Sequence, residues 1–157
     1  MSQISRKSFP SPFGFITFSA EGEKITAVEL CKKVTSTGKS DVIELAGEQL
    51  KLYLAGSLAK FSLPLKVSGT PFQIAVWRAI AKVPFGKSVS YGQIANQIGK
   101  PQAARAVGVA VGANPTPLLV GCHRVLGANS SLTGYSGGKG LITKKLLLGH
   151  ESIEFNK

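Results

Sequence analysis

Residues 118–136 read LLVGCHRVLGANSSLTGYS, an apolar segment that a thiol, an imidazole and a guanidinium interrupt. Apolar residues stand on both sides of Cys122, His123 and Arg124, a pattern typical of a buried strand or a buried extended segment. Ionised groups are rarely buried unless they are paired. The sequence therefore indicates a functional centre at Cys122.

The length and composition describe one or two small domains without a membrane segment. The chain has 157 residues, and 43% of them are hydrophobic, which is enough for a core. No apolar run approaches the ~18 residues that span a bilayer, and the N-terminus lacks the apolar region of a secretory signal. We expect no membrane partner and an intracellular location, cytoplasmic in a bacterium or archaeon and nuclear in a eukaryote.

The charge balance favours a polyanionic partner. Nineteen basic residues stand against eight acidic ones, which leaves a net charge of +11. No basic amphipathic helix stands out, so nucleic acid is favoured over a membrane surface. A soluble protein that merely happens to be basic remains the alternative.

Two cysteines, Cys31 and Cys122, stand apart from any CxxC pair, and an intracellular setting disfavours a disulfide between them. A zinc site built from both cysteines with His123 and His150 would lack paired-ligand spacing. We therefore expect no metal and no cofactor. Cys31 is interpreted as a structural thiol at the end of a strand.

Residues 1–67 are predicted to form a small structural α/β domain. Residues 13–20 and 24–30 have the composition of two strands joined by a turn, which makes a hairpin. A helix is expected from Asp41, as its cap, to a point near Gly56.

Residues 68–157 are predicted to form a second, largely helical domain. Thr70, Pro71 and Gln73 together predict a helix start with a capping box. That helix is expected to bury one face, made of Ile74, Trp77, Ile80 and Ala81. Residues 141–149 are expected to form the last helix.

Two short helices between these indicate a helix-turn-helix. Ser90, with Gln93 three residues on, is predicted to cap the first. Gly99 is predicted to end it and Pro101 to open the second, which runs to residues 114–115. An ordinary helical hairpin in a core is the alternative. On the second helix one face is expected to be buried, namely Ala104, Val107, Ala110 and Val111. The other face consists of Arg105, Gly108, Val109 and Gly112.

This Arg-over-Gly face predicts close approach to a DNA backbone or minor groove rather than base readout, for which several long polar side chains would be needed. Glycine inside a helix costs about 1 kcal/mol relative to alanine, which suggests that the close approach is required. Tight packing against another part of the protein is the alternative.

Cys122 itself fits a redox thiol, a hydrolytic nucleophile or an alkyl acceptor. Neighbours on a strand point to opposite faces, so His123 can assist Cys122 only through a local turn, for which Gly121 leaves room, or through a bridging water. Glu151 is the candidate for orienting His123, by residue type rather than by spacing.

Residues 69–151 resemble the O6-alkylguanine-DNA alkyltransferase family in the order and nearly the spacing of their motifs. The matching segments are GTPFQIAVW (69–77), VPFGKSVSYGQIA (83–95), AARAVGVAVGANP (103–115), LLVGCHRVLG (118–127), TGYSGG (133–138) and LLLGHE (146–151). The N-terminal third matches only loosely, in its size and its SPFGFI start. The resemblance implies a mixed α/β fold, with a small N-terminal domain and a C-terminal helix-turn-helix, winged-helix-like domain.

The resemblance also implies a DNA repair protein that flips alkylated guanine out of a duplex and moves the alkyl group irreversibly to its own cysteine, once per molecule. Cys122 would be the acceptor, His123 a base acting through water, and Glu151 the group that orients it. Asn114 would support the thiolate. Tyr91 would help rotate the 3′ phosphate and could donate a proton to the leaving guanine.

The remaining implied roles concern DNA and the base. Arg105 would enter the duplex in place of the flipped nucleotide, and Gly92 and Lys100 would lie against the backbone. The residues implied to line the guanine or alkyl side of the pocket are Pro117, Val125, Tyr135 and Ser136. The expected partner is double-stranded DNA with an alkylated guanine, bound by a monomer.

The sequence departs from the family at Gly121, where relatives have proline, and we expect the nucleophile to be less rigid there. Lys139 and Gly140 also add length before the last helix, so Glu151 aligns only if that helix shifts. An alkyltransferase-like damage sensor would lack Cys122. A Cys-His hydrolase would not explain the helix-turn-helix, the charge or the Arg-over-Gly face.

Overall fold

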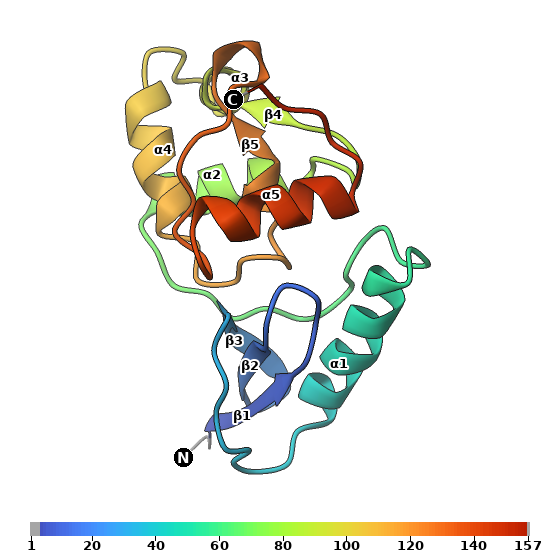
Figure 1. Ribbon diagram of the computed structural model, residues 1–157. Coiled ribbons are helices and arrows are strands. Elements are labelled where there is room, and N and C mark those ends of the chain that lie inside the picture. Colours follow the sequence, from blue (N-terminus) through green and yellow to red (C-terminus); the bar gives the residue numbers. More distant parts are fainter. Residues whose placement is uncertain (1–3, 157) are drawn as a thin grey trace. The chain divides into compact units, whose positions relative to one another are not determined.

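Two compact units, Met1–Val67 and Ser68–Lys157, make up the computed structural model (Figure 1). The structure describes residues 4–156. Among them, no helix combines the length and the apolar character that a membrane crossing requires. The first unit contains a small sheet and the second is mainly helical, so the predicted mixed α/β fold class is confirmed.

The N-terminal unit is built on a three-stranded antiparallel sheet in the order β1 (Ile4–Phe9), β2 (Ile16–Glu21) and β3 (Lys24–Leu30). The β2–β3 hairpin follows the prediction, although β2 begins at Ile16 rather than at residue 13. Strand β1 was not predicted. Its sequence, ISRKSF, is polar, as suits an edge strand; beyond its pairing with β2, Arg6 forms a single bridge with Thr37.

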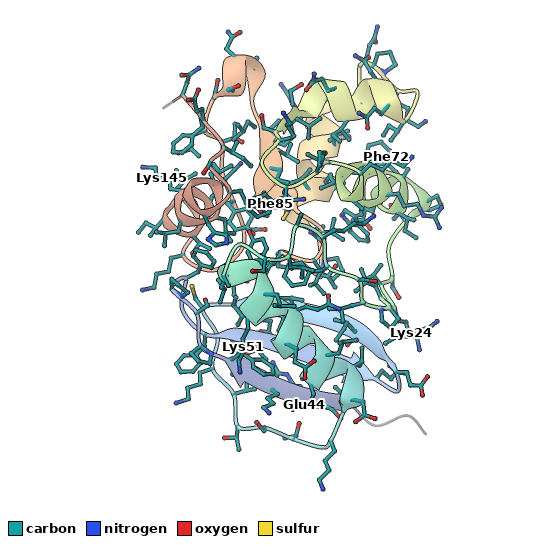
Figure 2. All side chains as sticks on the ribbon, turned by 90° about the vertical axis from the view of Figure 1, so that its right-hand side faces the viewer. Lys24, Glu44, Lys51, Phe72, Phe85 and Lys145 are labelled. Carbon is teal, nitrogen blue, oxygen red and sulfur yellow. The ribbon has the colours of Figure 1, made fainter. Side chains whose placement is uncertain are left out.

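Helix α1 (Asp41–Leu54) covers this sheet, as Figure 1 shows. Its N-cap is Ser40, whose hydroxyl accepts a hydrogen bond from the Ile43 amide at 3.3 Å, so the predicted cap at Asp41 was wrong by one residue. Asp41 instead lies in the first turn, where its negative charge interacts favourably with the helix dipole. Glu44 and Lys51 lie on the exposed side of the helix (Figure 2).

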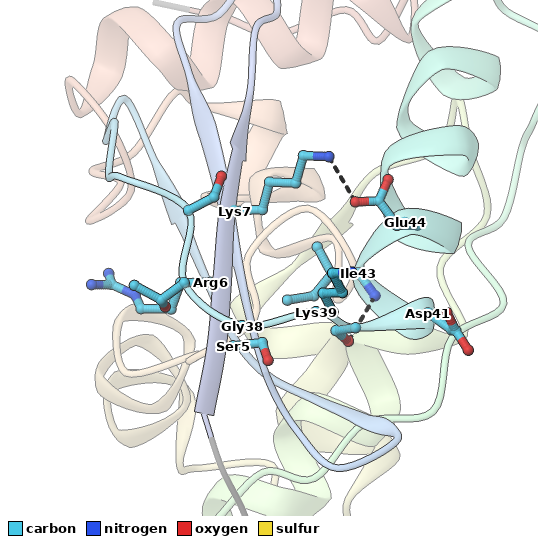
Figure 3. Close-up of a pocket in the computed structure, with 11 residues that line it drawn as sticks. Ser5, Arg6, Lys7, Gly38, Lys39, Asp41, Ile43 and Glu44 are labelled. Atoms are coloured by element: carbon cyan, nitrogen blue, oxygen red, sulfur yellow. Dashed lines mark hydrogen bonds and ion pairs between the residues drawn. The ribbon is translucent and has the colours of Figure 1, made fainter.

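A hollow of about 400 Å³ lies beside the start of α1 (Figure 3). Two of the cations at its wall already have partners. Arg6 forms an ion pair with Glu29, and Lys7 donates to Glu44 at 2.7 Å. The charges of these two cations are therefore balanced within the protein.

The C-terminal unit follows the order α2 (Pro71–Ala81), β4 (Val89–Ser90), α3 (Tyr91–Gln97), α4 (Ala104–Gly112), β5 (Val125–Leu126) and α5 (Leu141–His150). Strands β4 and β5 form a short parallel pair. Both predicted capping boxes, Thr70 with Gln73 and Ser90 with Gln93, are present. The indole of Trp77 donates to the Ala110 carbonyl at 2.8 Å, which joins α2 to α4.

Two details of these helices differ from the prediction. Helix α2 buries Val76, Trp77, Ala79 and Ile80, so its buried face does not include Ala81, which is exposed. Helix α4 begins at Ala104 rather than at Pro101, because residues 100–103 form a turn closed by the Ala103 amide and the Lys100 carbonyl at 2.9 Å.

Replacing Thr70 by alanine removes the hydroxyl that caps α2, so the free energy of unfolding should fall by about 1 kcal/mol. Urea denaturation measures this change. Thr70→Ser keeps the hydroxyl and serves as the control, and equal loss in both variants would contradict a capping role.

Candidate active site

The segment around Cys122 is buried, as predicted, but it is a turn and not a strand. Residues Cys122–Arg124 form a 3₁₀ turn (η1), and only Val125–Leu126 pair with β4. Gly121, with φ −73° and ψ 61°, is the centre of an inverse γ-turn, in which the Cys122 amide donates to the Val120 carbonyl at 2.7 Å. In a strand the side chains of Cys122 and His123 would point to opposite faces. The two turns remove this constraint.

At Gly121 the limit on a side chain is space and not backbone conformation. A φ of −73° is one that proline adopts. A Cβ placed on Gly121, however, would lie 3.0 Å from Nη1 and 3.1 Å from Cζ of Arg124. A side chain at this position would therefore press on the Arg124 guanidinium.

Asn114 joins the end of α4 to the turn before Cys122. Its amide nitrogen donates to the Val120 carbonyl at 3.0 Å, and its amide oxygen accepts from the Thr116 amide at 3.0 Å. The Val120 carbonyl thus accepts from both Asn114 and the Cys122 amide, which positions the cysteine relative to α4.

The carboxylate of Glu151, at the end of α5, is the centre of a buried polar network. Its Oε2 lies 2.6 Å from Nε2 of His123 and accepts from Nη2 of Arg124 at 3.1 Å. Its Oε1 accepts from Nε of Arg124 at 2.8 Å. The Gly86 amide donates to Oε1 at 3.2 Å. Glu151 and His123 are both buried, so the network is shielded from water.

His123 is held as a neutral imidazole. Burial lowers its pKa, although the hydrogen bond and the charge of Glu151 act in the opposite direction. A carboxylate only accepts, so Nε2 must carry the hydrogen. The lone pair is therefore on Nδ1, which has no hydrogen-bond partner among residues 4–156. An unpartnered buried nitrogen of this kind can receive a proton.

Cys122 is 3% exposed, and burial raises the pKa of its thiol. Hydrogen bonds from Asn114 and Tyr135 and the positive charge of Lys144 lower that pKa. Because burial is the largest of these effects, the resting group is a thiol that needs a base before it can react.

Lys144 was not predicted to belong to the site. Its ammonium group donates to the Val125 carbonyl at 2.7 Å and to the Thr133 hydroxyl at 3.1 Å, and the residue is only 1% exposed. Burial lowers the pKa of Lys144 to about 8. The sequence did hold a signal, because Lys144, Leu147, Leu148 and Glu151 share one helical face, and two ionisable residues on an apolar stripe are unusual.

A second hollow, of about 680 Å³, lies between α3, α4 and residues 128–133. Its lining includes three of the predicted DNA-contacting residues, Tyr91, Gly92 and Arg105, together with Thr133. The Tyr91 hydroxyl lies 2.8 Å from the Thr133 hydroxyl. Lys100 is exposed in the turn before α4 and does not line this hollow.

The predicted base-contacting residues lie in the segments around Cys122. Pro117 is buried and forms a bridge with Val120. The Ser136 hydroxyl donates to the Gly112 carbonyl at 2.9 Å and so connects its loop to the end of α4. Among residues 4–156, no group of three His, Cys, Asp or Glu side chains could hold a metal ion.

Helix α4 presents the predicted Arg-over-Gly face outward. Arg105, Val109 and Gly112 are exposed, with Val109 72% exposed, and Gly108 is half-buried. On the opposite side Val107, Ala110 and Val111 are buried as predicted, whereas Ala104 is only half-buried. A single cationic side chain above small residues leaves the helix backbone open to close approach.

Two family models together match nearly the whole chain. Residues 71–153 match the DNA-binding domain of 6-O-methylguanine DNA methyltransferase, and residues 4–67 match its ribonuclease-like domain.

Individual relatives agree with these models. The constitutive methylated-DNA–protein-cysteine methyltransferase of Bacillus subtilis is 41% identical over 157 residues, which cover 94% of each chain. A crystal structure of the O6-methylguanine methyltransferase of Mycobacterium tuberculosis has a TM-score of 0.84 and 39% identity, covering 95% of this chain and 93% of that one. A crystal structure of the Mycobacterium tuberculosis protein in complex with DNA has a TM-score of 0.83 and 42% sequence identity. The match covers 93% of this chain and 91% of that one.

The buried neutral His123 predicts a dependence of stability on pH. Because burial lowers the pKa of His123 from 6.5, the unfolded chain takes up a proton that the folded chain resists. His123 should therefore lower the free energy of unfolding by about 1 kcal/mol as the pH falls from about 7.5 to about 5.5. Urea denaturation at both pH values measures the loss.

His123→Gln introduces an amide that can donate to Glu151 but does not titrate. The part of the pH-dependent fall in the free energy of unfolding that is due to His123 should therefore disappear in this variant. His150→Gln is the matched control, and the loss of stability due to His123 should persist in it. An unchanged pH dependence in His123→Gln would contradict a neutral buried imidazole.

Proposed function

Because the chain belongs to the 6-O-methylguanine DNA methyltransferase family, as its motifs predicted, we propose that it repairs alkylated DNA by transferring the alkyl group from guanine O6 to Cys122. One observation supports this most strongly. Cys122 is a buried thiol that adjoins in sequence a neutral imidazole whose Nδ1 can accept a proton, in a protein whose exposed helix face suits DNA. The C-terminal unit carries both functions in this proposal.

DNA binding is assigned to α3 and α4. Phosphates bind basic side chains and exposed amides without regard to sequence, which suits a protein that must inspect any site. Gly92 and Lys100 contact the DNA backbone in this proposal, and the glycines of α4 let the DNA approach the helix closely. Arg105 enters the base stack in place of the flipped nucleotide, since an alkylated guanine inside a duplex is out of reach of a buried thiol.

The transfer requires a base, a nucleophile and an acid. His123 accepts the thiol proton at Nδ1 through a water molecule, while Glu151 holds the ring through Nε2. Asn114, Tyr135 and Lys144 stabilise the thiolate, which attacks the carbon bonded to O6. Tyr91 donates a proton to the departing guanine. The resulting thioether has no easy hydrolytic exit, so each molecule reacts once.

The base itself is received by the loops around Cys122. The Val125 carbonyl and the backbone or hydroxyl groups of Tyr135 and Ser136 are suited to bind the guanine edge, and Pro117 lines the alkyl side. Because the Ser136 hydroxyl already donates to Gly112, its backbone amide is the more available donor. The protein acts as a monomer in this proposal, since one chain supplies every group used.

Incubating the protein with duplex DNA that carries a radiolabelled O6-methyl group should move about one label to each protein molecule, because the thioether is a dead end. Cys122→Ser should abolish the transfer, and Cys31→Ser should leave it intact. Release of the label as methanol, or several turnovers per molecule, would refute an acceptor cysteine.

Arg105→Ala should slow repair of a lesion in duplex DNA by about tenfold or more, because flipping costs a few kcal/mol that the inserted side chain offsets. Repair of the same lesion in a single strand should change much less, since no pair must be replaced. Rates on both substrates, with Arg78→Ala as a surface control, test this. Equal losses on the two substrates would argue against insertion.

A further inference from the structure

Thr133 lies between two groups of the site that are not adjacent to one another in the sequence. Its hydroxyl oxygen accepts from the Lys144 ammonium at 3.1 Å and lies 2.8 Å from the Tyr91 hydroxyl. Thr133 also lines the hollow that contains Tyr91 and Arg105. Lys144 is buried on its other side and donates to the Val125 carbonyl. Thr133 takes no part in the alkyl transfer proposed above.

The three groups allow a direction of donation that ends at Tyr91. An ammonium group can only donate, so the Thr133 oxygen is the acceptor of that bond. The hydroxyl hydrogen of Thr133 is then available for the Tyr91 oxygen at 2.8 Å. In this arrangement the Tyr91 hydroxyl can donate its own hydrogen to an acceptor in the hollow. The order Lys144, Thr133, Tyr91 therefore points a proton toward the position of a bound base.

The charges in the site change together during alkyl transfer. Before the reaction, the thiolate of Cys122 and the ammonium of Lys144 partly compensate one another, as the mutual effects on their pKa values indicate. After the reaction the sulfur is a neutral thioether, and Lys144 has lost its negative neighbour in a poorly solvated position. Because burial already lowers the pKa of Lys144 to about 8, this loss makes it a better acid at the moment when guanine departs as an anion.

We propose that Thr133 is a positioning residue that orients Tyr91 toward the substrate and passes a proton from Lys144 to it as guanine leaves. The step balances. The sulfur–carbon bond forms, the carbon–O6 bond breaks, and the electron pair stays on guanine. Tyr91 gives its proton to guanine, Thr133 gives its proton to Tyr91, and Lys144 gives one to Thr133 and ends as a neutral amine. This inference rests on the proposed alkyl transfer.

Thr133→Val removes the hydroxyl and nearly keeps the shape, whereas Thr133→Ser keeps the hydroxyl. Single-turnover reactions with O6-methylguanine duplex DNA separate the maximal rate from the half-saturating concentration of DNA. The valine variant should lose about tenfold or more in maximal rate, as expected for impaired proton transfer, with little change in half-saturation. The serine variant should recover most of the rate. Thermal unfolding checks that both variants are folded.

Methyl iodide provides a reaction of the same thiol that needs no acid, since iodide leaves without a proton. The rate of Cys122 methylation, followed by mass spectrometry of its peptide, should be nearly the same in Thr133→Val and the parent protein. Lys144→Met should slow both reactions, because the thiolate loses a stabilising charge. In a Tyr91→Phe background, Thr133→Val should have almost no further effect on repair.

Three results would overturn the relay. They are an unchanged repair rate in Thr133→Val, an equal slowing of repair and of methyl iodide reaction, and an independent loss in the Tyr91→Phe background. The proposed alkyl transfer fails in a different way, namely if the parent protein accepts no methyl group from DNA while its Cys122 still reacts with methyl iodide.

Discussion

The buried carboxylate of Glu151 is the constraint on which the rest of the C-terminal unit depends. It connects the end of α5 to His123 and Arg124 in the 3₁₀ turn and to the amide of Gly86 in the loop after α2. Phe85, labelled in Figure 2, lies in the same region. Its ring makes an edge contact with the ring of His150. Removing one partner from such a network leaves a buried charge unpaired, which typically costs about 3–5 kcal/mol. The same bonds that hold the turn also select the tautomer of His123.

Burial gives the nucleophile both its protection and its need for assistance. A thiol in this position is shielded from other electrophiles, but its deprotonation is opposed by the loss of water. The site compensates with fixed polar groups, since the side chains of Asn114 and Tyr135 and the positive charge of Lys144 all act to lower the pKa of the thiol. These groups are positioned before any substrate arrives, so little reorganisation is needed during the reaction.

Signals between residues close in the sequence predicted many of the elements, whereas few contacts between distant residues were predicted, the pairing of Glu151 with His123 being one of them. The capping boxes at Thr70 and Ser90 and the β2–β3 hairpin depend on residues a few positions apart, and all were predicted. The apolar run around Cys122 indicated burial but could not distinguish a strand from consecutive turns, because periodicity does not report hydrogen bonds. The bond between Lys144 and Thr133 joins residues on a helix and a loop, and only the tertiary structure brings them together.

The protonation state of His123 tests this account most directly. Nitrogen NMR of the labelled imidazole at neutral pH should show a neutral ring with hydrogen on Nε2 and a bare Nδ1, because Glu151 accepts from Nε2 and burial disfavours the charged form. Glu151→Gln should disturb this state. An imidazolium, or a neutral ring with its hydrogen on Nδ1, would leave no base for Cys122 and would contradict the account.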